Sequence, residues 1–463
     1  MLNSSTIDKT LIQMYQQSGP RYTSYPAAVH FHEGFNDNHY TAMVKHTNEE
    51  LIPSPLSIYI HIPFCRHICF YCACNRIITN NQDKAVLYLS NLYREIIMQG
   101  KLFDRDRVVE QLHWGGGTPT FLKNNQIRDL MNVIQDNFSL RDDDKGDYSI
   151  ELDPRELGED TIPILRETGF NRISIGVQDF NPVVQEAVNR IQTVEETQNA
   201  ITVARRENFH SVNVDLIYGL PGQSVKTFLE TLKIVVEMNP DRIAIYNYAH
   251  LPHLFKSQRQ IDQTLLPSSE TRFEILQQFV VYLTENGYMY IGMDHFARPD
   301  DDLAQAQQSG TLHRNFQGYS TRAGCDLVGM GVSAISSIGS GYAQNTRSLA
   351  EYEENIQNER IPIIRGIKLD NDDLLRRDVI NKLICNFRVN YSEIEELHCI
   401  DFEDYFYDEL ILLKKMQSHG LLDIDVEDIK VTIKGRFLIR NICMVFDKYM
   451  YPNRFKGTFS QVI

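Results

Sequence analysis

Four of the eight cysteines of this 463-residue chain fall within ten residues, between Cys65 and Cys74. Cys65, Cys69 and Cys72 have the spacing C-x3-C-x2-C, and Cys74 follows two residues later. Thiolates this close in sequence can hold a soft metal centre, because a short loop can point them all inward. Three thiolates on a [4Fe–4S] cluster leave one iron free to bind and activate a small molecule. The loop therefore predicts a cluster of this kind.

Disulfide bonds, a zinc site and chance clustering are the alternatives for this loop. The chain opens with a polar segment that lacks the apolar core of a signal peptide, so we expect a cytoplasmic protein whose thiols stay reduced. A zinc site needs a second pair of ligands at suitable spacing. The remaining cysteines are isolated in the sequence and are expected to be buried apolar residues: Cys325, Cys385, Cys399 and Cys443.

Composition and charge narrow the possible partners. At 42% hydrophobic and 23% charged residues, the chain has an ordinary globular composition and is long enough for two or three domains. Its formal net charge of −15 disfavours nucleic-acid binding, which needs a basic face. An anionic substrate requires basic side chains to be gathered in one pocket. No apolar run approaches the roughly 18 residues of a membrane span, so none is expected.

From residue 56 onward, predicted strands alternate with predicted helices. Apolar periodicity places the strands at 56–62, 108–114, 148–152, 172–178, 211–218 and 242–248. The helices are expected from Asp83 onward and at 124–138, 159–168, 194–208, 225–238 and 269–286. Six strand–helix units in series predict an α/β fold in which a curved parallel sheet has helices outside it. This is a partial (β/α)6 barrel of the TIM type, with its chemistry at the carboxyl ends of the strands.

Glycine and polar residues gather after these strands, as the barrel requires. The first strand leads into the cysteine loop and the second into the run Gly115–Thr118; the later strand ends carry Glu151, Asp153, Gln178, Asp215 and His250. The glycine run lacks the Gly-Lys-Ser/Thr of a Walker loop and is not G-x-G-x-x-G. It is either a tight turn or a place where the backbone approaches a ligand closely. Its position beside the cysteine loop favours the ligand.

The segments around the barrel define the expected domains: an N-terminal arm at 1–55, the barrel with a pocket-lining segment at 56–345, and a mainly helical domain at 346–463. The arm contains a possible helix at 6–17 and a turn-rich stretch around Arg21, which either packs passively or covers an active site with Arg21 facing a carboxylate. Residues 290–345 are expected to be irregular and rich in glycine. They form either the wall of a pocket or loops that close the bottom of the barrel.

The C-terminal domain is expected to contain helices at 371–386, 402–420 and 434–449, with a hairpin at 421–431. This order of elements resembles a winged-helix domain, which usually binds DNA. The acidic balance of the chain favours a lid or a packing domain instead.

The cysteine motif after a strand resembles the signature of radical S-adenosylmethionine (SAM) enzymes. The surrounding residues, Ser57–Phe64 and Cys72–Asn75, resemble oxygen-independent coproporphyrinogen III oxidases, and the resemblance extends from residue 18 to residue 463. It implies a radical SAM barrel with one [4Fe–4S] cluster per chain on Cys65, Cys69 and Cys72. Cys74 is then needed for activity without being a cluster ligand. One or two SAM molecules bind beside the cluster.

The resemblance also assigns residues to the ligands. The family's SAM-contacting positions correspond to Tyr59, Tyr71, Gly116, Gly117, Thr118, Glu151, Gln178, Arg190, Asp215, Ala249 and Ile335. Positions near the substrate correspond to Arg21, Phe316 and Gln317. At Tyr71 relatives can carry phenylalanine, and a ring stack or backbone contact there tolerates the extra hydroxyl.

The implied reaction is the oxidative decarboxylation of two propionates of coproporphyrinogen III to vinyl groups, which gives protoporphyrinogen IX in haem biosynthesis. A 5′-deoxyadenosyl radical from SAM starts it, and a low-potential electron donor is required. A monomer is expected, with no nucleic-acid partner. One alternative is a radical-SAM-like haem chaperone, which keeps C-x3-C-x2-C but lacks Cys74 and the segment 20–23; both are present here. The other is a non-catalytic iron–sulfur regulatory protein that uses the C-terminal helices.

Overall fold

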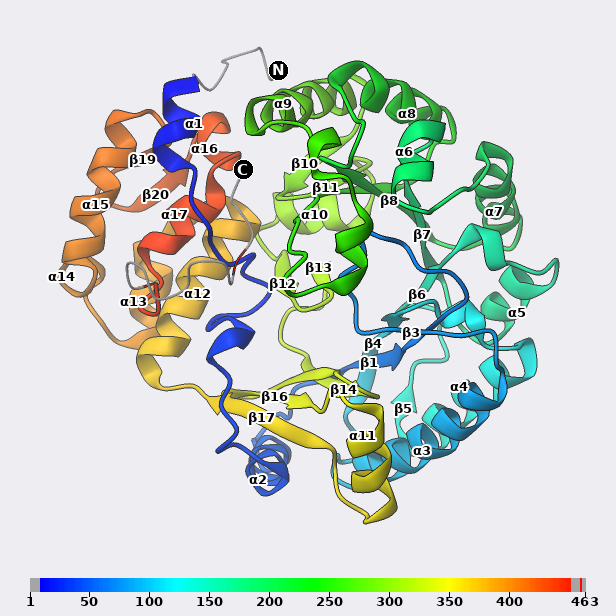
Figure 1. The fold of residues 1–463 in the computed structure, drawn as a ribbon. Coiled ribbons are helices and arrows are strands. Elements are labelled where there is room, and N and C mark those ends of the chain that lie inside the picture. Colours follow the sequence, from blue (N-terminus) through cyan, green and yellow to red (C-terminus); the bar gives the residue numbers. More distant parts are fainter. Residues whose placement is uncertain (1–8, 451–458, 460–463) are drawn as a thin grey trace.

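The six expected parallel strands form the centre of the structure, a computed structural model that describes residues 9–450 and residue 459 (Figure 1). They are β1 (Leu56–Ile62), β4 (Val108–Gly116), β6 (Asp147–Leu152), β7 (Arg172–Gln178), β8 (Ser211–Tyr218) and β9 (Arg242–Asn247). Each lies parallel to the next in chain order. Ile60 of β1 is fully buried and pairs with Trp114 of β4. These strands confirm the partial (β/α)6 barrel.

The helices that follow these strands in the chain form an arc around the outside of the sheet (Figure 1). They are α3 (Asp83–Gly100), α4 (Asn124–Asn137), α5 (Thr161–Glu167), α6 (Pro182–Ala187), α7 (Val194–Arg206), α8 (Val225–Glu237) and α9 (Ser269–Glu285). The starts of α7 and α8 are fixed by capping boxes at Thr193 and Ser224, which satisfy backbone N–H groups that a helix leaves unpaired. The short helix α6 was not expected from the sequence.

The segment 290–345 is not the irregular stretch that its glycines suggested. It forms β10 (Met289–Gly292), β11 (His295–Ala297), α10 (Asp302–Gln308), β12 (His313–Asn315), β13 (Gly318–Ser320), β14 (Asp326–Met330), β15 (Ile335–Ile338) and β16 (Gly341–Asn345). Strand β14 lies parallel to β1, on the side away from β4. A Cβ atom at Gly329 of β14 would lie 2.4 Å from the carbonyl oxygen of Ile335. The glycines therefore permit close strand packing, although glycine weakens a strand signal in the sequence.

The main sheet continues beyond residue 345. After α11 (Leu349–Gln357), strand β17 (Ile363–Lys368) pairs antiparallel with β16. The strands follow the order β10-β11-β9-β8-β7-β6-β4-β1-β14-β15-β16-β17, with the short β5 (Ser139–Leu140) beside β4. The proposed division at residue 345 therefore falls inside a continuous sheet, and the three-domain scheme stays a prediction.

The C-terminal part is mainly helical, as expected. It contains α12 (Asn371–Asn386), α13 (Tyr391–His398), α14 (Phe402–Tyr405), α15 (Tyr407–Ser418), α16 (Ile433–Arg436) and α17 (Ile439–Val445). The expected hairpin is present as β19 (Leu422–Ile424) and β20 (Asp428–Val431), and β18 (Arg388–Asn390) adds a third strand. The expected helices at 402–420 and 434–449 are each broken in two. The first break falls at Phe406, whose buried ring packs against Phe402 and Phe446.

The N-terminal arm runs along the boundary between the C-terminal helices and the barrel (Figure 1). Its helix α1 (Lys9–Tyr15) lies within the expected range, of which residues 6–8 are outside the described residues. A second helix, α2 (Asp37–Asn48), was not expected. Between them, the Tyr22 hydroxyl donates to Asp447 Oδ2 at 3.0 Å, and Arg440 Nε donates to the Pro20 carbonyl at 2.9 Å. The arm is therefore held by α17 and the residues that follow it.

The four isolated cysteines differ in exposure. Cys385 and Cys443 are buried, as expected, and Cys325 is partly buried. The expectation is wrong for Cys399, which is exposed because it forms the left-handed C-cap of α13 at the surface, with φ of 54°. In the part of the chain that the structure describes, no helix is long and apolar enough to cross a bilayer.

Candidate active site

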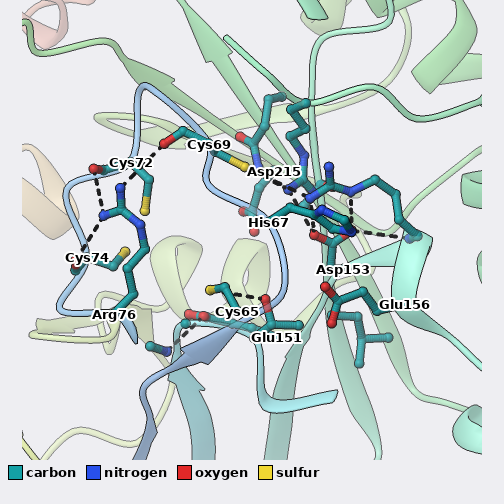
Figure 2. A pocket seen from close by; sticks show the side chains of 18 of the residues that line it. Cys65, His67, Cys69, Cys72, Cys74, Arg76, Glu151, Asp153, Glu156 and Asp215 are labelled. Atoms are coloured by element: carbon teal, nitrogen blue, oxygen red, sulfur yellow. Dashed lines mark hydrogen bonds and ion pairs between the residues drawn. The ribbon is translucent and has the colours of Figure 1, made fainter. Parts of the chain in front are cut away.

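The cysteine loop begins where β1 ends, at the carboxyl edge of the barrel. Two short parallel strands, β2 (Phe64–Cys65) and β3 (Ile77–Ile78), bring the ends of the loop together. Within the loop, Arg76 donates to the carbonyl oxygens of Cys72 at 2.9 Å, Cys74 at 3.2 Å and Cys69 at 3.4 Å. This one guanidinium fixes the backbone of three cysteines, and all four cysteines line a single pocket (Figure 2).

Hydrogen-bond donors face two of the sulfur atoms. Thr118 Oγ1 lies 3.5 Å from Cys65 Sγ, and Arg190 Nη1 and Arg155 Nη2 lie 3.7 and 3.9 Å from Cys69 Sγ. Such donors stabilise a thiolate more than a thiol. Across residues 9–450, no three His, Cys, Asp or Glu side chains converge closely enough for a single metal ion.

Cys72 and Cys74 form an asymmetric pair. The pKa of Cys72 is lowered to about 6, chiefly because the Cys74 thiol donates a hydrogen bond to it; partial burial opposes the shift and the charge of Arg76 adds to it. The same hydrogen bond raises the pKa of Cys74 well above its ordinary value. The two neighbouring cysteines therefore have different environments.

The glycine run packs the end of β4 against the cysteine loop. A Cβ atom at Gly116, where φ is +115°, would lie 2.6 Å from the His61 ring, and one at Gly117 would lie 2.7 Å from the Phe64 carbonyl oxygen. Gly116 N–H donates to Glu151, Gly117 N–H to the Ile62 carbonyl and Thr118 N–H to the Phe64 carbonyl. These N–H groups are used within the protein, so a ligand here would meet carbonyl groups or the Thr118 side chain instead.

Two carboxylates are held at the strand ends. Glu151 Oε2 accepts from Gly116 N–H at 3.2 Å, and its Oε1 lies 3.3 Å from His113 Nε2. Asp215 accepts from Ser174 Oγ at 2.6 Å and from Asn213 Nδ2 at 2.8 Å, and burial raises its pKa to about 6. Each carboxylate retains acceptor capacity, which suits the hydroxyl or amino groups of a bound ligand.

Gln178 occupies a special position at the end of β7. Its φ of 72° is left-handed, and the register of β7 against β8 shifts between Gly176 and Gln178. A bulge of this kind re-aims a side chain, and residues in this region of φ gather at functional sites. Gln178 lines the pocket of the four cysteines.

Arg190 is buried beside the cysteines, with 6% of its surface exposed. Its Nη1 donates to Asp153 Oδ2 at 3.0 Å and its Nη2 to the Gly176 carbonyl at 2.5 Å, while Nε has no partner among the described residues. Arg155 lies 2.6 Å from the same Asp153 oxygen. Although burial opposes it, the charges of Arg190 and Arg155 lower the pKa of Asp153 to about 2. Arg190 is therefore not a surface residue of the barrel helices.

Comparisons with known proteins agree with this geometry. Residues 59–235 match the radical SAM superfamily, and residues 369–438 match the HemN C-terminal domain. The oxygen-independent coproporphyrinogen III oxidase of Pseudomonas aeruginosa is 48% identical over 100% of both chains, and that of Escherichia coli is 50% identical over 98% of each. The chain belongs to the oxygen-independent coproporphyrinogen III oxidase family. It is therefore an oxidoreductase of the radical SAM superfamily.

A solved structure within this family has the same fold. Coproporphyrinogen III oxidase (HemN) from Escherichia coli, described as a radical SAM enzyme, matches with a TM-score of 0.90 and 49% identity. The match covers 96% of this chain and 99% of that chain. The family implies a [4Fe–4S] cluster and SAM, and three thiols in one loop, with donors beside the sulfur atoms of Cys65 and Cys69, fit a cluster.

Most residues assigned by resemblance to the family lie around one pocket, at the carboxyl ends of the strands. These are Cys65, Cys69, Tyr71, Cys72, Cys74, Gly116, Gly117, Thr118, Glu151, Gln178, Arg190 and Asp215. Three others do not line this pocket: Tyr59, Ala249 and Ile335. Tyr59 stacks on His113 at 5.9 Å, and Gln258 joins Ala249 to Tyr71 by donating to both carbonyls, at 3.1 and 3.0 Å. The ligand roles of all these residues stay predictions.

The residues assigned to the substrate lie apart from the cysteine pocket. Arg21 forms an ion pair with Asp294, and its guanidinium lies 5.9 Å from the ring centre of Tyr246. A substrate carboxylate would have to compete with Asp294 for it. Gln317, in the β12–β13 turn beside Phe316, has both amide atoms buried without a partner in the described part of the chain. Its amide is therefore available to a ligand.

Several pocket residues were missing from the sequence-based set. Among them are His67, Arg76, Arg155, Glu156 and Ser174. Arg76 follows Cys74 by two residues, and Arg155 follows the Asp153–Pro154 pair at the end of β6. The closeness of these two arginines in the sequence to the cysteines and to a strand end could have predicted that they line the pocket.

Proposed function

We propose that this protein decarboxylates two propionate side chains of coproporphyrinogen III to vinyl groups, giving protoporphyrinogen IX in haem biosynthesis without oxygen. The observation that carries the proposal is the pocket formed by Cys65, Cys69 and Cys72 at the carboxyl end of the barrel. Each conversion removes one hydrogen atom, one carbon dioxide and one electron from a propionate. Cys74 and the arm segment 20–23 favour this reaction over the haem-chaperone alternative.

Cys65, Cys69 and Cys72 would hold one [4Fe–4S] cluster. When bound, the cluster with SAM supplies the electron and the 5′-deoxyadenosyl radical that removes the propionate hydrogen. Thr118, Arg155 and Arg190 donate toward the sulfur ligands and offset part of their negative charge. Donors placed in this way tune an iron–sulfur centre and orient its ligands.

The surrounding residues would position one SAM, or two, against the cluster. Asp215 and Gln178 accept ribose hydroxyls, and the buried Arg190 meets the methionine carboxylate through its unpaired Nε. The remaining members of the proposed SAM set are Tyr59, Tyr71, Gly116, Gly117, Thr118, Glu151, Ala249 and Ile335. Their common task is to hold the reacting groups together and to exclude water.

The remaining partners follow from the chemistry. Arg21, Phe316 and Gln317 would contact the substrate, and a low-potential donor would supply the electron. We propose a monomer that works in the cytoplasm, where the cysteine loop stays reduced.

The test is an anaerobic assay of the full chain after reconstitution with iron and sulfide. With SAM and a reductant, the protein should convert coproporphyrinogen III to a product that has lost two carboxyl groups, which mass spectrometry detects. A Cys65→Ser protein is the matched control and should give no product. Haem binding without decarboxylation by the cluster-loaded protein would instead support the chaperone.

A further inference from the structure

A second pocket, away from the cysteines, contains two arginines and no acidic lining residue among those that the structure describes. We call it the arginine pocket. Its charged side chains are Arg314 of β12 and Arg377 of α12, and its walls include Ser24, Phe316 and Tyr342. The chain carries a net charge of −15, so two guanidinium groups facing a space without a carboxylate are a local concentration of positive charge.

Arg314 is buried and has unused donors. It is 7% exposed, and its Nε and Nη1 are buried without a hydrogen-bond partner in the described part of the chain. Its guanidinium contacts the ring of Tyr319, with 4.6 Å between the guanidinium carbon and the ring centre. A ring face does not replace the hydrogen bonds of a buried guanidinium, and an unpaired buried charge is costly. A bound anion would therefore stabilise the buried Arg314 guanidinium.

Arg377 supplies the second charge. Its closest acidic contact is long, with 3.8 Å between its Nε and Asp378 Oδ1, and Asp378 is also paired with His398 at 2.9 Å. The Arg377 side chain is 29% exposed, so an incoming group can reach it. Two arginines that line one pocket from β12 and α12 are suited to a carboxylate, which accepts paired hydrogen bonds from arginine.

His313 lines the same pocket without adding to its charge. The amide of Asn381 is oriented because its Oδ1 accepts from the Cys385 thiol at 3.0 Å, so its Nδ2 donates to His313 Nδ1 at 2.7 Å. The His313 proton then lies on Nε2. Burial and, next, the charge of Arg377 lower the pKa of His313 to about 4, which keeps the ring neutral. The positive charge of the pocket therefore comes from the two arginines.

The β12–β13 hairpin connects the arginine pocket with the proposed substrate position. Phe316 lines the pocket and also packs in one apolar cluster with Ile335, which is assigned to the SAM site. The next residue, Gln317, has a buried side-chain amide without a partner among the described residues. The arginine pocket and the cysteine pocket have no lining residue in common. A carboxylate bound by the arginines is therefore held away from the cysteines.

We propose that Arg314 and Arg377 bind one propionate of the tetrapyrrole substrate while a different propionate is decarboxylated. This inference rests on the proposed function, because it takes the tetrapyrrole as the ligand. The arm completes the site, since Ser24 lies in its wall. A fixed propionate would orient the macrocycle and place a second side chain toward the cysteine pocket.

The test compares Arg377→Gln with a matched control, Lys382→Gln. Both residues lie on α12, and Lys382 is paired with Glu393 outside the pocket. Because charge-assisted hydrogen bonds are lost, Arg377→Gln should raise KM for coproporphyrinogen III about tenfold or more, with little change in kcat. Cluster absorbance and SAM cleavage without substrate should not change. Lys382→Gln should match the unaltered protein in every measurement, and Arg377→Lys should recover part of the affinity.

Binding is measured separately from turnover with coproporphyrin III, the oxidised tetracarboxylate, by absorbance and fluorescence titration. Arg377→Gln should weaken its binding about tenfold. The variant should leave the binding of a neutral tetra-amide analogue unchanged. Arg314→Lys serves as a second variant that keeps the buried charge but removes the planar fork, and it should also bind the tetracarboxylate more weakly.

The outcomes separate this inference from the proposed function. Normal turnover by the unaltered protein, with equal KM and equal binding of coproporphyrin III in Arg377→Gln, would overturn the carboxylate site alone. An equal loss of binding for the tetracarboxylate and the tetra-amide would also overturn it. Absence of decarboxylation by the unaltered protein, combined with weaker coproporphyrin III binding in Arg377→Gln, would overturn the proposed function and leave the carboxylate site in place.

Discussion

Arg190 Nη1 lies 3.7 Å from the sulfur of Cys69. The two residues are far apart in the sequence, one in the loop after α6 and the other in the cysteine loop after β1. Through Asp153 and Gly176, Arg190 is also anchored to the ends of β6 and β7. One buried guanidinium thus fixes the position of the proposed cluster relative to the strand ends where SAM is expected.

Replacing Arg190 with alanine should weaken SAM binding and spare the cluster. The loss of charge-assisted hydrogen bonds to a carboxylate predicts a change of about 1.5–3 kcal/mol in SAM binding. Equilibrium binding of SAM to the reconstituted protein measures this, with iron content as the control. Unchanged SAM affinity would limit Arg190 to holding Asp153 and the cysteine loop.

The cysteines should separate into two classes. Serine at Cys65, Cys69 or Cys72 should abolish the iron–sulfur absorbance, because serine is a poor ligand for such a centre. Cys74→Ser should keep the absorbance and lose decarboxylation, because the family resemblance makes Cys74 necessary for activity without making it a cluster ligand. Loss of the cluster from Cys74→Ser to the same extent as from Cys65→Ser would show that the ligand assignment is wrong.

Deleting residues 1–26 should lower turnover of coproporphyrinogen III while cluster content and SAM cleavage remain measurable. The deletion removes the Arg21–Asp294 ion pair, the hydrogen bond from Tyr22 to Asp447 and the arm's wall of the arginine pocket. Arg21→Gln, which keeps the arm but removes its charge, distinguishes packing from charge. Equal turnover by the full-length and truncated proteins at matched cluster content would show that the arm only packs.

Glu95 of α3 should make the stability of the protein depend on pH. Burial raises the pKa of this fully buried carboxyl to about 7, although Tyr352, Gly331 and Asn345 donate hydrogen bonds to it. A carboxyl whose pKa is raised on folding contributes stability that is fully present below the unfolded-state pKa and is lost as pH rises through the folded-state pKa. Between about pH 4.5 and pH 7, this contribution should fall by about 3 kcal/mol.

Thermal unfolding of the protein and of Glu95→Gln at pH 5 and at pH 7.5 measures the effect. The advantage of glutamate over glutamine should be larger at pH 5, because glutamine does not titrate and the other groups cancel in the comparison. A difference in unfolding temperature that is the same at both pH values would contradict the assignment.

The sequence by itself determined the cysteine motif and the six parallel strands with most of their helices. These features are local. The motif lies within ten residues, and the apolar period of a strand or a helix is set by the face that it buries. The position of Glu151, Gln178 and Asp215 at the site follows from the same source, because parallel strands place their carboxyl ends at one edge.

Only the tertiary structure decided which distant segments meet. Strand β14 pairs with β1, although more than two hundred residues separate them in the sequence. Its glycines weaken the strand pattern, so the sequence did not predict it. Arg21 is paired with Asp294, whereas Arg314 and Arg377, from different elements, face one pocket without an acidic residue among its described lining. The sequence does not show whether an arginine side chain is paired with a carboxylate. Its neighbours are set by packing between elements, and local periodicity does not encode that packing.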